Sequence, residues 1–567
     1  MTTSGAGRHA AALLAVASIA VMLAAADTYV VVLALTDMMA GVGLPVDQLQ
    51  RAAPIISGFL LGYIAVLPLI GRLADLVSRQ RVLMACLVIF ILGSAITALA
   101  VDLPVLVTGR VVQGVGGGGL VPATLALVAD RWPADRRGLP LGVVGGVQEL
   151  GSVLGPLLGA AILAVADWRA IFWFNAVAGV VLLLATWALS RPSPSDGFGP
   201  PQGPPRRPET ITRRRGRGAV ARVLGVLATA LLLLALAAPT ALTTDVTWGV
   251  PFVPFVGDAR LLTPIGLTAA LLAVAAIALS ARDWWPILTR ADLPGAALLG
   301  GSLGCVVLTF AAADPEREVV GPAGYVLLPV GALLALGYLW RHRTATSPLV
   351  PRGTMRGRTG PALLVSLATG AALVAVVVDV PLLARLTTRA DQTAAALVLV
   401  RFLLAVPIGA VIGGWWTRRT GDGIVAGAGL LLAAAGLWEM SRWGLGSLDD
   451  PARSTITLAA VGFGLGLALA PVNNAALADA PDDAHGTASS LVVVARMVGM
   501  VVGLALLTAV GLHEYYRAVD ALPLDAPASE QVAAAVVQVH TVFTGAAIAA
   551  LVGAVVAVGL LGRRRVT

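Results

Sequence analysis

The sequence has 567 residues, of which 58% are hydrophobic and 12% are charged, and its formal net charge is +8. Soluble proteins carry about a quarter charged residues, so this composition excludes a soluble globular protein and indicates a polytopic helical membrane protein. The arginines gather between the apolar runs, so the positive charge does not indicate nucleic-acid binding. Cys86 and Cys305 lie far apart and the five histidines form no cluster, so we expect no disulfide framework, no metal site and no cofactor.

Apolar runs long enough to span a bilayer predict an all-α fold of two six-helix bundles joined by inserted helices. Six runs lie near 10–37, 52–76, 80–101, 104–130, 138–166 and 169–190. Residues 191–218 are rich in Pro, Gly and Arg and predict a flexible basic linker. Four runs follow near 219–239, 262–281, 293–313 and 322–340, and six more near 360–385, 392–416, 423–441, 455–478, 486–512 and 533–561. The expected domains are therefore 1–190, 191–358 and 359–567, with 16 spans, or 14 as the alternative.

The arginines predict the orientation of these spans. They fall in alternate connections: after the second and fourth spans, in the central linker, before residue 360 and at the C-terminus. Because positive charge stays on the cytoplasmic side, we expect a multi-pass protein of the cytoplasmic (inner) membrane with both termini inside.

Glycines recur at one spacing in the two six-helix groups. Gly114, Gly116, Gly118, Gly138, Gly151 and Gly155 are each followed 348 residues later by another glycine: Gly462, Gly464, Gly466, Gly486, Gly499 and Gly503. Two similar bundles that face each other are typical of a transporter with its site at the midplane. In the fifth run, Gly151, Gly155 and Gly159 share one helix face, which allows another helix to approach closely.

Ionisable residues inside apolar runs usually mark an ion or substrate path. Asp27 and Asp379 lie in the first run of each half, Glu149 in the fifth run, and Arg496 in the corresponding run of the second half. We expect Glu149 or Asp27 to take a proton, with Arg496 as the counter-charge. A carboxylate holds its proton more readily in apolar surroundings and releases it beside an arginine, which is the cycle that antiport needs. The alternative is a static ion pair that only fixes helix packing.

Several motifs resemble the major facilitator superfamily. The segment Gly71-Arg72-Leu73-Ala74-Asp75-Leu76-Val77-Ser78-Arg79-Gln80-Arg81 resembles its loop signature Gly-x-Leu-Ala-Asp-x-x-Gly-Arg-Lys, and departs from it at Ser78 and Gln80. Arg110-x-x-Gln113-Gly114 resembles the fourth-helix motif, and Gly151-x-x-x-Gly155-Pro156-x-x-Gly159 resembles the antiporter motif of exporters. Asp167-Trp168-Arg169 and Phe172-Trp173-Phe174-Asn175 resemble the fourteen-helix drug/proton antiporters.

Further segments resemble the mycobacterial triacylglyceride-transporter family. These are Asp27 to Val32, Gln148 to Ser152, Val378 to Val380, Pro407 to Ala410 and Val494 to Met497. The resemblance is missing across roughly 219–290, where this chain carries an additional helical hairpin. It implies proton coupling, lipid export, drug tolerance and work with a periplasmic lipid-carrying lipoprotein.

The resemblance also suggests roles for single residues. Arg110 corresponds to an arginine tied to proton coupling, with bonding to helix-end carbonyls as an equal alternative. Arg401 matches no motif. We expect it either to meet a lipid headgroup or to pair with Asp379. Asp75, with Arg79 and Arg81, is expected to form a cytoplasmic latch in which Asp75 pairs with an arginine across the seam between the halves. The second copy of this loop has Arg418 in place of the aspartate, which predicts an asymmetric latch.

Together with what the resemblance implies, these observations predict a proton-coupled secondary transporter that exports lipophilic cargo, such as neutral lipid or glycolipid. Few charged residues lie in the spans, so a bulky uncharged or weakly polar substrate suits the cavity. A multidrug antiporter for amphipathic cations is the alternative, with Asp27 and Glu149 as substrate counter-charges. An enzyme is not expected, because the outer loops are short and poor in catalytic residue types. The outer loop at 240–261 carries Trp248, Phe252 and Phe255, which predict headgroup anchoring or, less readily, docking of a lipoprotein or lipid.

Overall fold

The computed structural model describes residues 5–45, 49–189, 211–244, 249–255, 260–311, 323–388, 392–444, 446–523 and 527–562. Within these residues the chain is helical, without strands, and 16 helices are long and apolar enough to cross a membrane. This confirms the prediction of an all-α polytopic membrane protein. Helices suit this composition because a helix satisfies its backbone hydrogen bonds within one segment, as a lipid environment requires.

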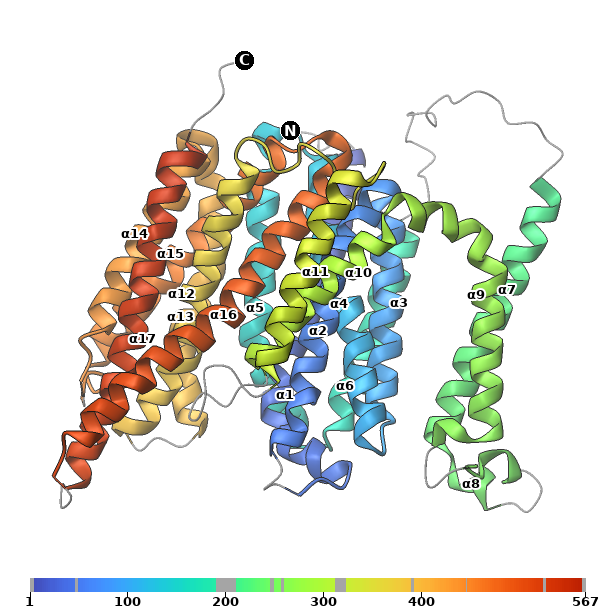
Figure 1. Ribbon diagram of the computed structural model, residues 1–567, viewed down its shortest axis with the longest axis horizontal. Coiled ribbons are helices and arrows are strands. Elements are labelled where there is room, and N and C mark those ends of the chain that lie inside the picture. The colour runs from blue at the N-terminus through green and yellow to red at the C-terminus, as the bar shows by residue number, and fades with distance from the viewer. Residues whose placement is uncertain are drawn as a thin grey trace.

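The helices fall into three consecutive groups (Figure 1). The first group is α1 (Gly5–Gly41), α2 (Leu49–Leu76), α3 (Arg79–Ala98), α4 (Leu103–Arg131), α5 (Gly138–Leu163) and α6 (Arg169–Ala188), with the 3-10 turn η2 (Ala134–Arg136) before α5. The inserted group is α7 (Ile211–Ala237), α8 (Thr240–Thr243), α9 (Pro264–Arg290), α10 (Leu293–Ala311) and α11 (Gly324–Thr344). The last group is α12 (Thr359–Thr388), α13 (Gln392–Thr420), α14 (Asp422–Met440), α15 (Pro451–Ala478), α16 (His485–Asp520) and α17 (Ala528–Val556), which continues into the π-helical turn η7 (Ala557–Leu561).

Three helices extend eight or nine residues beyond their apolar runs. Helix α7 begins at Ile211, inside the linker predicted to be flexible, α9 continues to Arg290, and α16 continues to Asp520. The expected ends were wrong here because a hydropathy run ends at the first charged residues. The helix itself continues, since Arg and Glu are good helix formers. The linker arginines Arg206 and Arg207 and the C-terminal Arg563, Arg564 and Arg565 lie outside the described residues.

The repeated glycines make equivalent helix contacts in the two halves. A Cβ atom added to Gly114 would lie 2.1 Å from the main-chain oxygen of Phe59 on α2, and one added to Gly462 would lie 2.3 Å from that of Phe402 on α13. Gly116 likewise faces α3, and its counterpart Gly464 faces α14. Small residues let helix backbones approach closely in lipid, where no hydrophobic force draws helices together. The internal repeat therefore corresponds to a repeated packing arrangement.

The two halves meet through paired glycines at one end of the bundle. An added Cβ would lie 2.6 Å from the oxygen of Gly486 if placed on Gly71, and 2.2 Å from that of Gly138 if placed on Gly414. We call this end, where α2 ends and α16 begins, the latch end. Helix α1 begins and η7 ends there as well (Figure 1). The halves are in tight contact at the latch end.

We expect Gly414→Ala to destabilise this seam. The new methyl group would meet the Gly138 backbone at 2.2 Å, a position from which no side-chain rotation can relieve the clash. Overpacking of this kind costs about 1–3 kcal/mol, which thermal unfolding of the purified protein will detect as a lower midpoint. Gly218→Ala on α7 is the matched control, because nothing lies within 4 Å of the added atom. Equal midpoints for the two variants would contradict the prediction.

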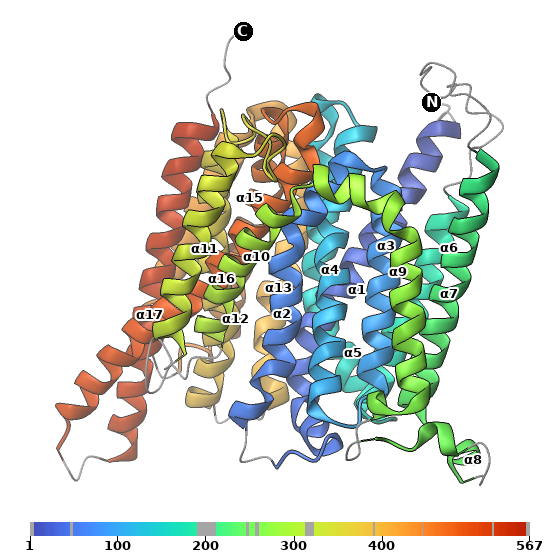
Figure 2. The same cartoon turned by 45° about the vertical axis from the view of Figure 1, so that its right-hand side comes forward.

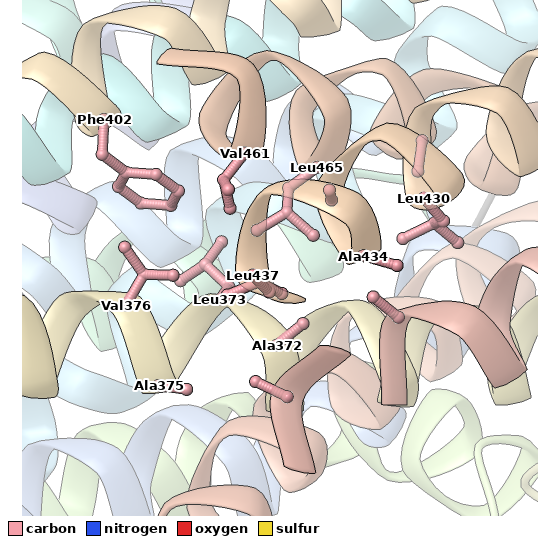
Figure 3. Close-up of a cluster of buried hydrophobic side chains, with 14 of the residues drawn as sticks. Ala372, Leu373, Ala375, Val376, Phe402, Leu430, Ala434, Leu437, Val461 and Leu465 are labelled. Atoms are coloured by element: carbon pink, nitrogen blue, oxygen red, sulfur yellow. The ribbon is translucent and has the colours of Figure 1, made fainter. Parts of the chain in front are cut away.

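An apolar core fills the second half. Phe402, Leu430, Leu437, Val461 and Leu465 are buried together between α12, α13, α14 and α15 (Figure 3). Tight packing of this kind keeps the helices of one half in fixed positions relative to each other. A charged residue placed on one of these helices therefore meets a defined partner.

The inserted helices form two pairs that pack differently. Helices α10 and α11 pack on each other, and α10 contacts both α2 and α16, so this pair covers the seam between the halves on one side (Figures 1 and 2). Asp292, just before α10, fixes the latch end of this helix pair. The Asp292 carboxylate accepts hydrogen bonds from Arg341 Nε at 2.6 Å and from the Leu349 N–H at 3.1 Å. Helices α7 and α9 pack mainly on each other and lie beside the first half. Leu232 and Leu236 of α7 pack against the apolar core of the first half.

Candidate transport site

A buried ion pair joins the two halves near the centre of the bundle. Nη1 of Arg496, on α16, lies 3.2 Å from Oε1 of Glu149, on α5. Each residue is only 6% exposed. Helices α5 and α16 occupy equivalent places in the repeat, so the pair lies across the axis that relates the halves. The sequence predicted that Arg496 is a counter-charge in this region, and the structure places it against Glu149 rather than Asp27.

The ion pair borders a small central cavity of about 70 Å³. Most of the lining is apolar or aromatic: Phe59, Leu60 and Tyr63 from α2, Leu373 from α12, and Met497 and Met500 from α16. Its polar lining comes from Thr28, Gln148, Glu149, Ser152 and Arg496. Between this cavity and the latch end lies a void of about 20 Å³ that Gln148 and Arg496 also line. The cavity is thus lined by apolar groups around a single charge pair.

The antiporter-motif glycines hold Glu149 close to the first helix. Added Cβ atoms on Gly151 and Gly155 would lie 2.4 Å from the main-chain oxygens of Met22 and Ala26 on α1. Gly159 continues the same stripe against Val30, and Pro156 lies within α5 between the last two glycines. This close contact fixes the position of α5, and with it the place where Glu149 meets Arg496.

A second buried network surrounds Asp27 within the first half. Asp27 Oδ2 accepts a hydrogen bond from Arg110 Nη1 at 2.5 Å, and Oδ1 accepts from Gln113 Nε2 at 3.0 Å and Asn175 Nδ2 at 2.5 Å. Gln113 also donates to the hydroxyl of Ser94 at 2.9 Å. Among the described residues, each polar partner of the carboxylate is thus a side chain from another helix, which holds Asp27 at a fixed point inside the first half.

Arg110 is held in this network by more than the ion pair. Its Nε donates to the main-chain oxygen of Ile55 at 3.3 Å. Arg110 thus contacts a main-chain carbonyl as well as a carboxylate, although Ile55 lies inside α2 and not at its end. Its guanidinium also lies 4.5 Å from the ring centre of Phe59 and 5.6 Å from that of Phe172. Aromatic faces stabilise a desolvated cation, which helps to keep this arginine buried.

Asp379 and Arg401 do not form a pair among the described residues. Asp379 is 1% exposed, and its Oδ2 has no hydrogen-bond partner there. Nη1 of Arg401 donates instead to the hydroxyl of Ser454 at 2.9 Å. The suggested Arg401–Asp379 pair is therefore absent from this part of the structure, because α13 directs Arg401 toward α15.

The latch uses the end of a helix rather than an arginine. Asp75 accepts hydrogen bonds from the N–H groups of Gly486 at 2.6 Å and Thr487 at 2.9 Å, and from the Thr487 hydroxyl at 2.7 Å. The expectation of an arginine across the seam was wrong, because the unpaired N–H groups at the start of α16 carry partial positive charge and meet Asp75 first. Arg79 lies 3.9 Å from Asp75 on the same half and 3.0 Å from Asp130, while Arg81 is exposed.

The other copy of the latch differs, as the sequence predicts. Arg418 Nε donates to the main-chain oxygen of Asp135 at 3.0 Å across the seam. Nearby, Arg358 binds Asp422 at 3.0 Å and Asp479 at 2.9 Å within the second half. Burial alone would lower the pKa of Arg358, but hydrogen bonds and attraction from these two carboxylates outweigh it and raise that pKa. Arg358 therefore stays charged at the start of α12.

We expect Asp75→Asn to shift the structure toward an open latch end. Loss of the charge at the start of α16 removes about 1–2 kcal/mol, so the open population rises by about tenfold. Spin labels at Arg136→Cys and Asp482→Cys, with Cys86 and Cys305 replaced, will report the change as a longer distance across the seam. Asp102→Asn, which replaces an aspartate that caps α4 through Val105, is the control. Unchanged distances in Asp75→Asn would contradict the prediction.

Sequence reasoning missed the partners that complete these networks. Gln113 and Asn175 stood out only as parts of motifs, and Ser94, Asp130 and Asp479 did not stand out at all. A signal existed for three of them, because Ser94, Gln113 and Asn175 are polar residues inside apolar runs. Trp248 of the outer loop lies outside the described residues, and Phe255 there is 68% exposed.

Two facing bundles with buried charge pairs at their centre define a multi-pass membrane transporter. The family model of the Major Facilitator Superfamily matches residues 17–320 and 321–504. This chain belongs to the Major Facilitator Superfamily. The matched ranges include the inserted helices, although the motif resemblance stops across 219–290.

Curated relatives narrow the class. A triacylglyceride transporter of Mycobacteroides abscessus is 35% identical over 531 residues, which cover 92% of this chain and 86% of the relative. A triacylglyceride transporter of Mycobacterium tuberculosis is 35% identical over 587 residues, covering 99% of this chain and 96% of the relative. The chain is thus a transporter rather than an enzyme, and is closely related to proteins named triacylglyceride transporters.

Solved structures agree on the fold. A proton:xylose symporter superposes with a TM-score of 0.55 at 12% identity, covering 97% of this chain and 95% of that chain. A human organic anion transporter superposes with a TM-score of 0.51 at 15% identity, covering 97% of this chain and 99% of that chain. At these identities the likeness shows the fold alone.

Proposed function

We propose that this chain is a proton-coupled secondary transporter that exports lipophilic cargo, such as triacylglyceride or a glycolipid-like lipid, by alternating access. The Glu149–Arg496 pair at 3.2 Å between the halves carries this proposal. It is the place where a relative movement of the halves changes the charge environment of a buried carboxylate. The relatives named triacylglyceride transporters support the class of cargo.

The coupling cycle follows from the two states of this pair. With the latch end closed, Glu149 faces Arg496 and holds no proton. When the halves separate at this site, Arg496 moves away and Glu149 takes a proton, because a buried carboxylate without a counter-charge is costly. Asp27 is a second proton site, with Arg110 as its partner. Asp379, whose Oδ2 has no hydrogen-bond partner in the described part of the chain, is a third. Arg401 would contribute charge near a lipid headgroup.

The arginine distribution supports a cytoplasmic position for the latch end, with both termini on that side of the inner membrane. Asp75 then holds the cytoplasmic side closed while the other side releases cargo. Phe252 and Phe255 lie in the connection between α8 and α9, at the opposite end of the bundle (Figure 1). Aromatic rings at that level anchor in the headgroup region. A periplasmic lipid-carrying lipoprotein would receive cargo on this side.

The test is lipid export from cells that lack their own transporter, measured beside efflux of a cationic dye. We expect the wild type to restore lipid export without dye efflux, and Glu149→Gln to abolish that export. Glu514→Gln, which removes an exposed carboxylate bound to Arg517, is the control and should export as the wild type does. Dye efflux by the wild type with unchanged lipid content would overturn the lipid proposal in favour of a multidrug/proton antiporter.

A further inference from the structure

A large polar cavity lies at the latch end, away from the central site. Its volume is about 650 Å³, and both halves contribute to its wall. Asp135 and Gly138 come from the first half, while the end of α13 and the start of α14 come from the second. Three arginines line it: Arg358, Arg418 and Arg419. The coupling mechanism proposed above uses none of this space.

Two of these arginines have positive charge to offer a ligand. The carboxylates of Asp422 and Asp479 neutralise Arg358. Arg418 uses its Nε on a main-chain oxygen, and the guanidinium of Arg419 lies 4.4 Å from the ring centre of Trp415. Neither Arg418 nor Arg419 forms an ion pair with a carboxylate among the described residues. A guanidinium group without a carboxylate partner can bind two phosphate oxygens at once through its forked N–H groups.

The backbone adds to the attraction for an anion. Gly421, with φ of 89°, turns the chain between α13 and α14, and the first residues of α14, Asp422, Gly423 and Ile424, line the same cavity. N–H groups at the start of a helix favour a bound anion. The Asp422 carboxylate is already taken up by Arg358 and by Asn474 Nδ2 at 2.8 Å, which reduces its repulsion of a ligand.

Aromatic side chains beside the cavity indicate where the anion comes from. Trp415 and Trp416, in the last turns of α13, are 46% and 45% exposed. Tryptophans at helix ends lie at the headgroup level of a bilayer. A phosphate that arrives as part of a lipid can therefore enter the cavity while its acyl chains stay in the membrane. Basic pockets of this kind between membrane helices bind anionic headgroups.

We propose that the Arg418–Arg419 cavity binds the phosphate-bearing headgroup of an anionic phospholipid as a site separate from the cargo path. Because the wall comes from both halves, a bound headgroup stabilises the closed latch end. The proposal requires only that the chain is embedded in a membrane, so it does not depend on the identity of the cargo.

The test is native mass spectrometry of purified protein offered equal amounts of phosphatidylglycerol and phosphatidylcholine. We expect the wild type to retain phosphatidylglycerol preferentially, and the double variant Arg418→Gln, Arg419→Gln to lose about tenfold of that retention, as the removal of two basic groups predicts. The pair Arg418→Lys, Arg419→Lys keeps the charge but not the forked geometry, so it should retain more phosphatidylglycerol than the glutamine variant does, which separates lost binding from lost folding. Phosphatidylglycerol should also raise the thermal unfolding midpoint of the wild type but not that of the glutamine variant.

The matched control is Arg282→Gln with Arg290→Gln. These two exposed arginines flank Trp284 and Trp285 at the latch end of α9 and do not line the cavity. They should leave lipid retention unchanged. Equal loss in this control, or full retention in the Arg418→Gln, Arg419→Gln variant, would overturn the proposal. Inorganic phosphate tests the source: protection by free phosphate without any preference for phosphatidylglycerol would overturn the lipid assignment.

Discussion

Glu149→Gln and Arg496→Gln should each abolish lipid export, and each should also lower the free energy of unfolding by about 3–5 kcal/mol, the usual cost of breaking a buried ion pair from one side. Each single variant leaves one partner buried without the charge that lies 3.2 Å away. Thermal or chemical unfolding measures the second effect, and export from cells lacking their own transporter measures the first.

The double variant Glu149→Gln, Arg496→Gln distinguishes coupling from packing. Replacing both charges with amides removes the unpaired charge, so most of the stability should return, because a neutral pair often replaces a buried ion pair at little cost. Export should stay absent, since no proton can be taken up at this position. If export returned together with stability, the pair would be a static packing contact and the coupling role of Glu149 would be wrong.

Asp27→Asn should separate proton coupling from cargo movement. The amide removes the charge as protonation does, and its one oxygen can still accept from Arg110, which lies 2.5 Å from Asp27. Its NH2 group then faces Gln113 and Asn175, whose own side-chain amides must turn to accept from it. Transport driven by a pH gradient into proteoliposomes should fall by at least about tenfold, as expected when an essential intramembrane charge is lost. Exchange of labelled for unlabelled cargo, which needs no net proton movement, should persist.

The dependence of gradient-driven transport on pH gives a second test of the role of Asp27. If Asp27 releases its proton on one side during each cycle, gradient-driven transport by the wild type should depend on the pH of that side, while the small residual transport of Asp27→Asn should not. Asp102→Asn, which conserves the cap of α4, should behave as the wild type in both assays. Equal loss of gradient-driven transport and exchange in Asp27→Asn would instead assign Asp27 a purely structural role.

Much of the candidate site was accessible to sequence reasoning because each part depends on residues close together in the chain. Asp27 and Glu149 stood out because a carboxylate inside an apolar run is costly and therefore conspicuous. Gly151, Gly155 and Gly159 predicted a close helix neighbour from their spacing alone. The repeat from Gly114 to Gly462 indicated two similar bundles without naming the helices that touch.

The sequence did not show in the same way which polar residues contact each other. Asp27 meets Arg110 and not Arg496, Asp75 meets the start of α16 and not an arginine, and Arg401 meets Ser454. In each case the partner lies on another helix, and helical periodicity fixes the face of a residue but not the neighbour of that face. The true ends of α7 and α9 were also missed, because hydropathy measures the apolar part of a helix and not its backbone.

The sequence by itself indicated the class of this protein, the repeat of its two halves and the 16 helices that, among the described residues, are long and apolar enough to span a membrane. Composition and spacing are properties of local segments, which must satisfy their backbone inside a bilayer. Only the tertiary structure decided which charges neutralise each other, which glycines form the seam, and where a basic cavity opens between the halves. Those features depend on the position and rotation of whole helices, which are set by packing between segments hundreds of residues apart, as the contact of Glu149 with Arg496 shows.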